Sequence, residues 1–437
     1  MSGTGKRTRR WFGTDGIRGA YGQEPMTEAF VYRCGRAAAD FFGRSHASPL
    51  LVVGRDTRES GLSLERALCQ GLREGGAQVR CLGVLPTAAV SLLTLRWKAS
   101  AGIMISASHN EFSDNGIKFF GPEGFKLGDE MELALEQRIE AVEWSELSEF
   151  PGSEVRAGME YELQEEAFRV YAEVLRGSLD EGLNLKGMKI WVDAAHGAAW
   201  QTTPRMLREL GAELELLGAE PDGRNINASC GSLHPELVQK RIREAGQAGG
   251  IGICHDGDAD RVVMVDDGMR SHWMGMKCWR WWGLDAVGRG KLSGNAVVAT
   301  VMSNLGLDEA FRAQGAEVRR TAVGDRYVLE AMKEGGHGLG GEQSGHMLFL
   351  EHLPTGDGLL TALQVIQVMK RQGRELRELR KVLKKYPQKL FNVKVKEKVP
   401  FEQIPGLSEV VAEVEAEMGE LGVWCCVIPG RKTSCDC

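Results

Sequence analysis

Short apolar runs of strand length alternate with amphipathic segments of helix length along most of this 437-residue chain. An apolar run at 50–54 precedes a helical pattern at 60–74, and a predicted strand at Lys189–Asp193 precedes a helical pattern and a second predicted strand at 213–217. Strands that alternate with helices in this way predict layered α/β domains. Because the functional residues of such domains gather where strands end, the polar residues that follow the apolar runs are the first candidates for a site.

Composition limits the classes of protein to which the chain can belong. A chain of this length predicts about three domains with ample core. The net charge of −6 argues against a nucleic-acid partner, and the sequence has no apolar run long enough for a membrane span. Ten irregularly spaced cysteines without a CxxC pair predict a reducing cytoplasm. The acidic segment 130–149 predicts a helix whose carboxylates face solvent.

One apolar run leads into residues typical of a nucleophile site. The run 103–105 ends in Ser106–Asn110, and a second short strand returns Lys118 to the same region. Serine is a weak nucleophile at neutral pH and needs a neighbouring base or a metal. His109 and Lys118 are the acid–base candidates, and Lys118 needs a depressed pKa for that role. A plain Ser/Asn-rich turn between two strands is the alternative.

A second apolar run, 251–254, leads into three carboxylates at alternate positions. Asp256, Asp258 and Asp260 project the same way if the backbone is extended. Carboxylates packed this closely repel one another unless a cation lies between them, so the pattern predicts a Mg²⁺ site. Arg261 stands where an EF-hand loop would need glycine, which argues against that match. An acidic surface turn is the remaining alternative.

Two further loops have the composition of anion-binding or sugar-binding segments. The segment 11–19 contains three glycines that let backbone N–H groups approach an anion, and Arg18 can grip a phosphate. In the segment 340–346, Glu342 and Ser344 can present a carboxylate and a hydroxyl to sugar hydroxyls. Taken singly, a segment like 11–19 is more often a plain turn, and 340–346 is only a plausible polar loop.

Together these motifs resemble those of the α-D-phosphohexomutase superfamily. GIMISASHNEFSDNGIKFFG resembles its phosphoserine loop, DGDADR its metal loop and GEQSGH its sugar-binding loop. The opening FGTDGIRG, and Gln343 within GEQSGH, favour the phosphoglucosamine mutase branch. The resemblance implies three α/β/α domains around a cleft and a small C-terminal α+β domain of the TATA-box-binding-protein-like type. The expected bounds are 1–160, 161–265, 266–384 and 385–437.

The function implied by the resemblance is the interconversion of glucosamine 6-phosphate and glucosamine 1-phosphate in amino-sugar metabolism. Phospho-Ser108 would exchange its phosphoryl group with the sugar through a sugar bisphosphate, which also acts as the primer. One Mg²⁺ per chain would be held by Ser108 with Asp256, Asp258 and Asp260. An activating kinase or a bisphosphate donor would be a partner. Other catalytic roles fall on Arg18, His109 and Lys118, and substrate-binding roles on Arg261, Gly324, Asp325, Glu342, Ser344 and His346.

Three other functions fit the same residues. The first is a mutase of the same superfamily that acts on mannose or glucose phosphates. The second is a Mg²⁺-dependent phosphatase, and the third is a catalytically impaired polypeptide that still binds sugar phosphates. One departure from the family pattern lies in the phosphoserine loop, where Glu111 replaces the usual proline and adds a negative charge.

Two stretches, Met269–Trp282 and Val423–Cys437, do not follow the pattern of the rest. They hold five of the ten tryptophans and five of the ten cysteines, and Trp279–Trp282 has neither helical nor strand periodicity. Codons for His272–Trp282 read two nucleotides later encode Asp-Gly-x-Glu-(Val/Met)-Leu-Ala-x-Val, which the family has there. The same shift from Val423 permits R-x-S-G-T-E, the family's fourth-domain phosphate loop. We therefore interpret both stretches as frameshifted, and expect an exposed aromatic patch and a missing phosphate loop.

Overall fold

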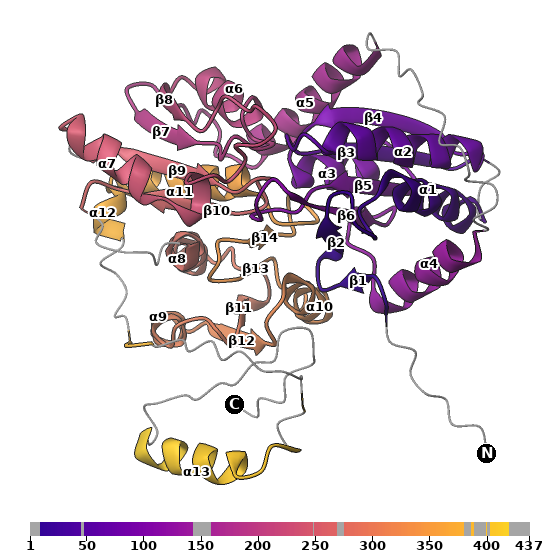
Figure 1. The fold of residues 1–437 in the computed structure, drawn as a ribbon. Helices are drawn as coiled ribbons and strands as arrows, with labels where there is room; N and C mark the ends of the chain where they lie inside the picture. Colours follow the sequence, from indigo (N-terminus) through magenta and orange to yellow (C-terminus); the bar gives the residue numbers. More distant parts are fainter. Residues whose placement is uncertain are drawn as a thin grey trace.

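The computed structural model describes residues 9–44, 48–142, 159–247, 249–268, 275–379, 386–388, 399 and 403–418. Three α/β units follow one another along the chain and meet near the middle of the molecule (Figure 1). This arrangement confirms the predicted α/β class. Of the predicted fourth domain, the described part is mainly one helix, α13 (Leu407–Met418), so its α+β fold stays a prediction.

The first unit is built on a six-stranded mixed sheet. In spatial order its strands are β1 (Phe12–Gly13), β2 (Gly16–Ala20), β6 (Asp114–Phe120), β5 (Ala101–Ile105), β3 (Leu50–Arg55) and β4 (Gln78–Val84). The helices of the unit are α1 (Glu28–Gly43), α2 (Gly61–Glu74), α3 (Thr87–Arg96) and α4 (Asp129–Ala141).

Both faces of this sheet are covered, as the two-residue period of its strands requires. In β3, Leu51 and Val53 pack in the cluster formed with α1, α2 and α4. Val52, which points to the other face, packs with α3 and with α5 (Met159–Gly177). The strand therefore reads as a continuous apolar run, because neither of its faces meets water.

The second unit is a four-stranded sheet in the order β10 (Val262–Val265), β9 (Ile251–His255), β7 (Lys189–Asp193) and β8 (Glu213–Leu217). Its helices are α6 (Thr202–Glu209) and α7 (Glu236–Glu244), with a short 3₁₀ turn, η2 (Gly231–Leu233). Because β7 pairs in parallel with both β8 and β9, the residues that follow β9 emerge at the carboxyl edge of parallel strands. The metal-loop aspartates lie at this edge.

The third unit is a four-stranded sheet in the order β12 (Glu317–Thr321), β11 (Ala296–Thr300), β13 (Leu339–Gly341) and β14 (Met347–Phe349). Its helices are α8 (Gly275–Gly288), α9 (Gly306–Arg312), α10 (Asp325–Gly335), α11 (Gly358–Gln372) and α12 (Leu376–Leu379), with a 3₁₀ turn, η3 (Ser293–Asn295). The sugar-binding loop predicted from the sequence connects the antiparallel pair β13 and β14.

The structure corrects the expectation of an exposed aromatic patch for Trp281 and Trp282. Helix α8 runs through Trp279–Trp282, and the side chains of Trp281 and Trp282 are buried. The Trp282 ring meets Phe349 edge-on, with centroids 5.2 Å apart. These two indole rings are therefore packed inside the third unit and not exposed to solvent. The packing leaves one polar atom unpaired, because the buried Trp282 Nε1 has no hydrogen-bond partner within the described residues. The side chains of 269–280 lie outside the described residues.

The prediction for the acidic segment 130–149 is also wrong in part. Helix α4 ends at Ala141, and Glu132 and Glu136 are buried rather than solvated. Glu136 accepts hydrogen bonds from the backbone N–H groups of Trp11 and Phe12, each at 2.7 Å. These carboxylates therefore anchor the N-terminal segment to the first unit, which helical periodicity alone does not reveal.

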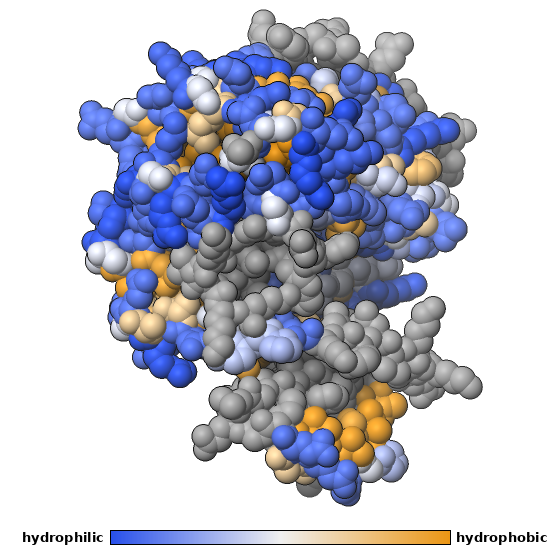
Figure 2. Space-filling model, turned by 90° about the vertical axis from the view of Figure 1, so that its left-hand side faces the viewer, coloured by the Kyte–Doolittle hydropathy of each residue, from blue (hydrophilic) through white to orange (hydrophobic). Residues whose placement is uncertain are grey.

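Helix α13 and the segment just before it expose hydrophobic side chains. Hydrophilic residues cover most of the face in Figure 2, and one of its hydrophobic areas lies at the lower end, on α13. Val410 of this helix is 53% exposed, and Ile404 just before it is 39% exposed. Among the described helices, none is both long and apolar enough to cross a membrane.

Candidate active site

Ser108 lies where the first and second units meet. It follows β5, and its backbone takes a φ of 53°, a left-handed conformation that non-glycine residues adopt rarely and mostly at special sites. Its buried Oγ donates a hydrogen bond to Asp256 Oδ2 at 2.7 Å and lies 3.4 Å from His109 Nδ1. The structure thus brings the predicted nucleophile to the predicted metal loop.

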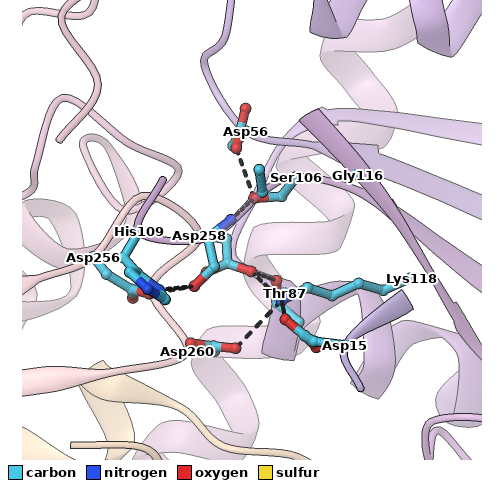
Figure 3. A network of polar contacts seen from close by, with 12 residues as sticks. Asp15, Asp56, Thr87, Ser106, His109, Gly116, Lys118, Asp256, Asp258 and Asp260 are labelled. Atoms are coloured by element: carbon cyan, nitrogen blue, oxygen red, sulfur yellow. Dashed lines mark hydrogen bonds and ion pairs between the residues drawn. The ribbon is translucent and has the colours of Figure 1, made fainter. Parts of the chain in front are cut away.

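A buried ion pair holds the serine loop in this conformation. Arg58 Nε donates to Asp56 Oδ2 at 2.9 Å with both side chains fully buried, and Arg58 Nη2 donates to the Ser108 carbonyl at 3.0 Å. Ser106 Oγ donates to the same Asp56 oxygen at 2.6 Å and accepts from the Ser108 N–H at 2.9 Å (Figure 3). Our sequence reasoning assigned no role to Asp56 and Arg58, although their position directly after β3 is a signal that could have identified them.

The three metal-loop aspartates form one compact cluster. Oxygens of Asp256, Asp258 and Asp260 lie within 4.8 Å of one another, and all three side chains are buried. Within the described part of the chain, Asp258 Oδ1 and Asp260 Oδ1 are buried without hydrogen-bond partners. Burial, together with the charges of Asp260 and Asp258, raises the pKa of Asp256 well above its ordinary value. Orphaned oxygens and mutual repulsion fit a cluster that holds a divalent cation.

One further residue contacts this cluster from the first unit. Thr87, the first residue of α3, donates from Oγ to Asp258 Oδ2 at 2.7 Å, and its backbone N–H donates to the Asp258 carbonyl at 3.0 Å. The sequence carries no motif that marks this threonine. Its role follows only from the packing of the first unit on the second.

Lys118 lies against the same aspartates, but not in the state that the sequence analysis required. Its buried Nζ is 2.8 Å from Asp258 Oδ2, 3.5 Å from Asp260 Oδ2 and 3.2 Å from Asp15 Oδ2 (Figure 3). Burial lowers the pKa of Lys118, but the charges of Asp15, Asp258 and Asp260 outweigh burial and raise it. Lys118 therefore lacks the depressed pKa that a role as a base would require, because three carboxylates stabilise the ammonium form.

His109 carries the opposite shift. Burial lowers the pKa of its imidazole to about 4, and the nearby positive charges of Arg261 and Arg18 act in the same direction. The ring is consequently neutral at pH 7. Next to Ser108 Oγ the structure therefore places a neutral imidazole, and across the cluster it places a charged ammonium.

Two arginines flank the cluster. Arg18 Nη1 donates to the Ala107 carbonyl at 3.0 Å, and its other guanidinium nitrogen pairs with Asp15. Arg261 Nε lies 3.7 Å from Asp260 Oδ1 and, within the described residues, is buried without a hydrogen-bond partner. Both predicted phosphate ligands thus lie beside the serine and metal loops.

The sugar-binding loop joins this assembly from the third unit. Arg261 and His346 form an isolated antiparallel bridge, and His346 Nδ1 lies 3.5 Å from Asp260 Oδ2. Glu342 Oε1 accepts a hydrogen bond from the Gly324 N–H at 3.1 Å. Ser344, at the tip of the loop, is exposed. Of the predicted substrate residues, only Asp325 has its carboxylate fully committed to protein partners, through Lys126 Nζ at 2.5 Å and the Arg326 N–H at 2.9 Å.

Comparison with known proteins agrees with this fold. The chain matches three domains of the phosphoglucomutase/phosphomannomutase family, in the order of the sequence. They are α/β/α domain I at residues 9–146, domain II at 169–269 and domain III at 282–386. These three matches place the protein in the class of the phosphohexomutases. The tryptophan-rich segment falls between the second and third matches. The domain bounds expected from the sequence remain predictions.

Curated relatives narrow the class. The phosphoglucosamine mutase of Geotalea daltonii is 44% identical over 95% of this chain and 90% of its own length. That of Nitratidesulfovibrio vulgaris is 43% identical and that of Geobacter metallireducens 45% identical, with the same coverage of both chains. The chain belongs to the phosphoglucosamine mutase family.

Solved structures show the same fold. A protein of Thermus thermophilus assigned as a phosphomannomutase superposes with a TM-score of 0.74 at 26% identity, over 85% of this chain and 82% of that one. The N-acetylphosphoglucosamine mutase of Aspergillus fumigatus, solved with GlcNAc-6P and magnesium, gives a TM-score of 0.64 at 16% identity, over 94% of this chain and 88% of that one. At the lower identity the likeness concerns the fold alone.

Proposed function

We propose that this chain interconverts glucosamine 6-phosphate and glucosamine 1-phosphate through a phosphoserine at Ser108. The observation that carries the proposal is the position of Ser108 Oγ, 2.7 Å from Asp256 in the carboxylate cluster and next to a neutral imidazole. Membership of the phosphoglucosamine mutase family supports the choice of sugar.

Each half of the proposed reaction moves one phosphoryl group. The phosphorus–oxygen bond to Ser108 breaks as one forms to the C1 hydroxyl of glucosamine 6-phosphate. The hydroxyl proton leaves to a base, and the serine oxygen regains a proton. The product is a sugar 1,6-bisphosphate. Transfer of its C6 phosphoryl group back to Ser108 yields glucosamine 1-phosphate and restores the phosphoenzyme.

The residues around Ser108 have the proton states that these transfers need. His109 is neutral and can accept a proton, and a phosphoryl group on Ser108 would raise the pKa of the imidazole by adding negative charge beside it. Lys118 carries a proton and faces the cluster as a cation, so it suits proton donation and charge stabilisation better than proton abstraction.

Mg²⁺ is the cation that we propose for the cluster, one ion per chain. Asp256, Asp258 and Asp260 would hold it together with the oxygen on Ser108, because small hard cations prefer carboxylate and phosphoryl oxygens. When bound, the ion supplies charge neutralisation on the transferring phosphoryl group. Orphaned oxygens on Asp258 and Asp260 support the assignment independently of any relative.

Substrate recognition is proposed for residues that converge from three units. Arg18 and Arg261 would bind phosphate, because a guanidinium matches phosphate oxygens in a fixed fork. Glu342 and Ser344 would bind sugar hydroxyls. A sugar bisphosphate such as the reaction intermediate would serve as primer, and a kinase that phosphorylates Ser108 is the alternative activator. We also propose a cytoplasmic location, since the described cysteines are free thiols.

The test of this function is turnover by the full chain with Mg²⁺ and glucose 1,6-bisphosphate as primer. Phosphorus NMR with glucosamine, glucose and mannose 6-phosphates in parallel should show the fastest conversion to the 1-phosphate for glucosamine. Faster turnover of glucose or mannose phosphate would overturn the choice of sugar. Release of inorganic phosphate as the main product would identify a phosphatase instead.

A further inference from the structure

Six ionisable side chains form a closed ring in which acidic and basic residues alternate. We call this arrangement the charge ring. Its contacts are Asp260–Lys118 at 3.5 Å, Lys118–Asp15 at 3.2 Å, Asp15–Lys126 at 2.5 Å, Lys126–Asp325 at 2.5 Å, Asp325–His346 at 3.7 Å and His346–Asp260 at 3.5 Å. Because the third, fourth and fifth of these contacts lie away from Ser108, the ring extends beyond the reacting groups.

The charge ring passes through all three α/β units. The pair Lys118–Asp260 joins the first unit to the second, and His346–Asp260 joins the third to the second. Lys126–Asp325 is the contact that joins the first unit directly to the third. The Lys126–Asp325 contact closes the ring on the side where the sugar-binding loop lies.

Neighbouring contacts show that Lys126 belongs to a wider joint between the first and third units. Arg326, the residue after Asp325, donates from Nη2 to the Leu127 carbonyl at 2.8 Å and pairs with Glu132 at 2.9 Å. The N-terminus of α10 is therefore held against the segment 126–132 by pairs of both polarities.

Lys126 acts on the site through other residues. Within the described part of the chain its ion pairs are with Asp15 and Asp325, and its side chain is 14% exposed. The Lys126 contact fixes Asp325 Oδ2, which faces His346 Nε2 at 3.7 Å. The Gly324 N–H, one residue earlier, donates to Glu342. Holding Asp325 therefore fixes two residues of the sugar-binding loop at once.

We propose that Lys126 is a positioning residue for the mutase reaction, whose ammonium between Asp15 and Asp325 sets the sugar-binding loop against the phosphoserine loop. The proposal rests on the proposed function, because it assigns Glu342 and His346 to the substrate. It also revises the role expected for Asp325, which holds the loop in place instead of binding the sugar itself. Enzymes lose rate steeply when a bound group is misplaced, so such a brace matters without touching substrate.

The experiment compares Lys126→Met, which keeps the length of the side chain and removes its charge, with Lys126→Arg and Asp325→Asn. Lys333→Met is the matched control, because Lys333 is a lysine of the same joint that contacts the Phe125 ring, 4.2 Å from its centroid. Each variant of the full chain is assayed for binding of glucosamine 6-phosphate by calorimetry, for kcat and KM, and for phosphate on Ser108 by intact mass.

For Lys126→Met we expect Kd and KM for the sugar phosphate to rise on the order of tenfold to a hundredfold, because the loop is misplaced. Phosphorylation of Ser108 and Mg²⁺ affinity should stay at wild-type levels. Lys126→Arg should recover most of the loss, since it keeps the charge. The double variant Lys126→Met/Asp325→Asn should be no worse than the worse single variant, because the two residues act through one contact.

A second measurement keeps the proposal testable whichever sugar is the substrate. Amide hydrogen exchange of residues 340–346 should be faster in Lys126→Met than in wild type and unchanged in Lys333→Met, because the brace on the loop is lost. Unchanged exchange, or wild-type sugar-phosphate binding by Lys126→Met, would overturn the proposal. Faster exchange in a chain that prefers glucose or mannose phosphate would overturn only the proposed substrate.

Discussion

Ser108 Oγ donates a hydrogen bond to Asp256 Oδ2 at 2.7 Å across a separation of 148 residues in the chain. The contact joins the end of β5 in the first unit to the end of β9 in the second. Both partners are buried. Burial and the negative charges of Asp260 and Asp258 disfavour the anionic form of the Asp256 carboxylate that holds the serine. A site with this arrangement is prepared for a cation and a phosphoryl group between the two residues.

Ser108→Ala should abolish mutase turnover, because the alanine cannot carry the phosphoryl group. Intact mass and peptide mapping of the wild-type protein should place one phosphate on Ser108. Ser106→Ala is the matched control, since Ser106 only supports the loop through Asp56 and the Ser108 N–H. That variant should be slower but should still carry phosphate on Ser108. Phosphate on Ser106, or full turnover by Ser108→Ala, would rule out the mechanism.

Asp258→Asn should weaken Mg²⁺ binding and slow phosphoryl transfer by orders of magnitude, because it removes one of three carboxylates and unbalances Lys118. Mg²⁺ affinity by calorimetry and turnover across a Mg²⁺ series measure the two effects separately. Asp267→Asn, an acid outside the cluster, is the control and should leave both unchanged. If Asp258→Asn shows the same dependence on Mg²⁺ as wild type, the three aspartates are an acidic turn and not a metal site.

Asp357 should make stability depend on pH. Its buried carboxyl caps α11 at Leu360 N–H and accepts from Tyr171, and burial raises its pKa from 3.8 to about 6 despite these hydrogen bonds. The folded state therefore binds this proton more tightly than the unfolded state does. The resulting stabilisation is present below pH 3.8 and is lost as pH rises through about 6, amounting to about 3 kcal/mol.

The variant Asp357→Asn keeps the oxygen that accepts from the Leu360 N–H, replaces the oxygen that accepts from Tyr171 with an amide group, and cannot titrate. The pH dependence of its stability relative to wild type therefore isolates this contribution. Its thermal midpoint should rise relative to that of wild type as pH increases from about 4 to about 7. Differential scanning calorimetry of both proteins in matched buffers gives the difference directly. Parallel pH profiles for the two would show that Asp357 does not hold the extra proton in the folded state.

The frameshift interpretation predicts that the chain as given is a poor mutase and that a frame-corrected version is a good one. Correction replaces Trp281 and Trp282 by aliphatic residues and so removes the buried Trp282 N–H that lacks a partner among the described residues. It also supplies R-x-S-G-T-E after Val423, which a mutase needs to bind the phosphate that is not reacting.

Expressing both versions and comparing solubility, melting temperature and turnover tests this interpretation. The corrected chain should gain turnover more than stability, because the buried tryptophans already pack in α8. Equal turnover would mean that Met269–Trp282 and Val423–Cys437 are functional sequence as they stand.

The sequence by itself determined the α/β class, the strands that carry the loops and the candidates for the reacting groups. It could do so because a strand buried on both faces has a continuous apolar run, as at 190–192 in β7 and 251–254 in β9, and the chemistry follows directly after it. Ser108 and the three aspartates of the metal loop were recognisable because their residue types and spacing are local features of the chain.

Only the tertiary structure decided the charge state of Lys118 and the roles of Asp56, Arg58, Thr87 and Lys126. The pKa of Lys118 is set by Asp15, Asp258 and Asp260, and two of these come from another unit. The burial of Glu136 depends likewise on the N-terminal segment that packs on α4, and the burial of Trp282 on contacts such as that between α8 and Phe349. Coulomb interaction and desolvation act through space between residues far apart in the chain, so no local pattern of residues encodes their balance.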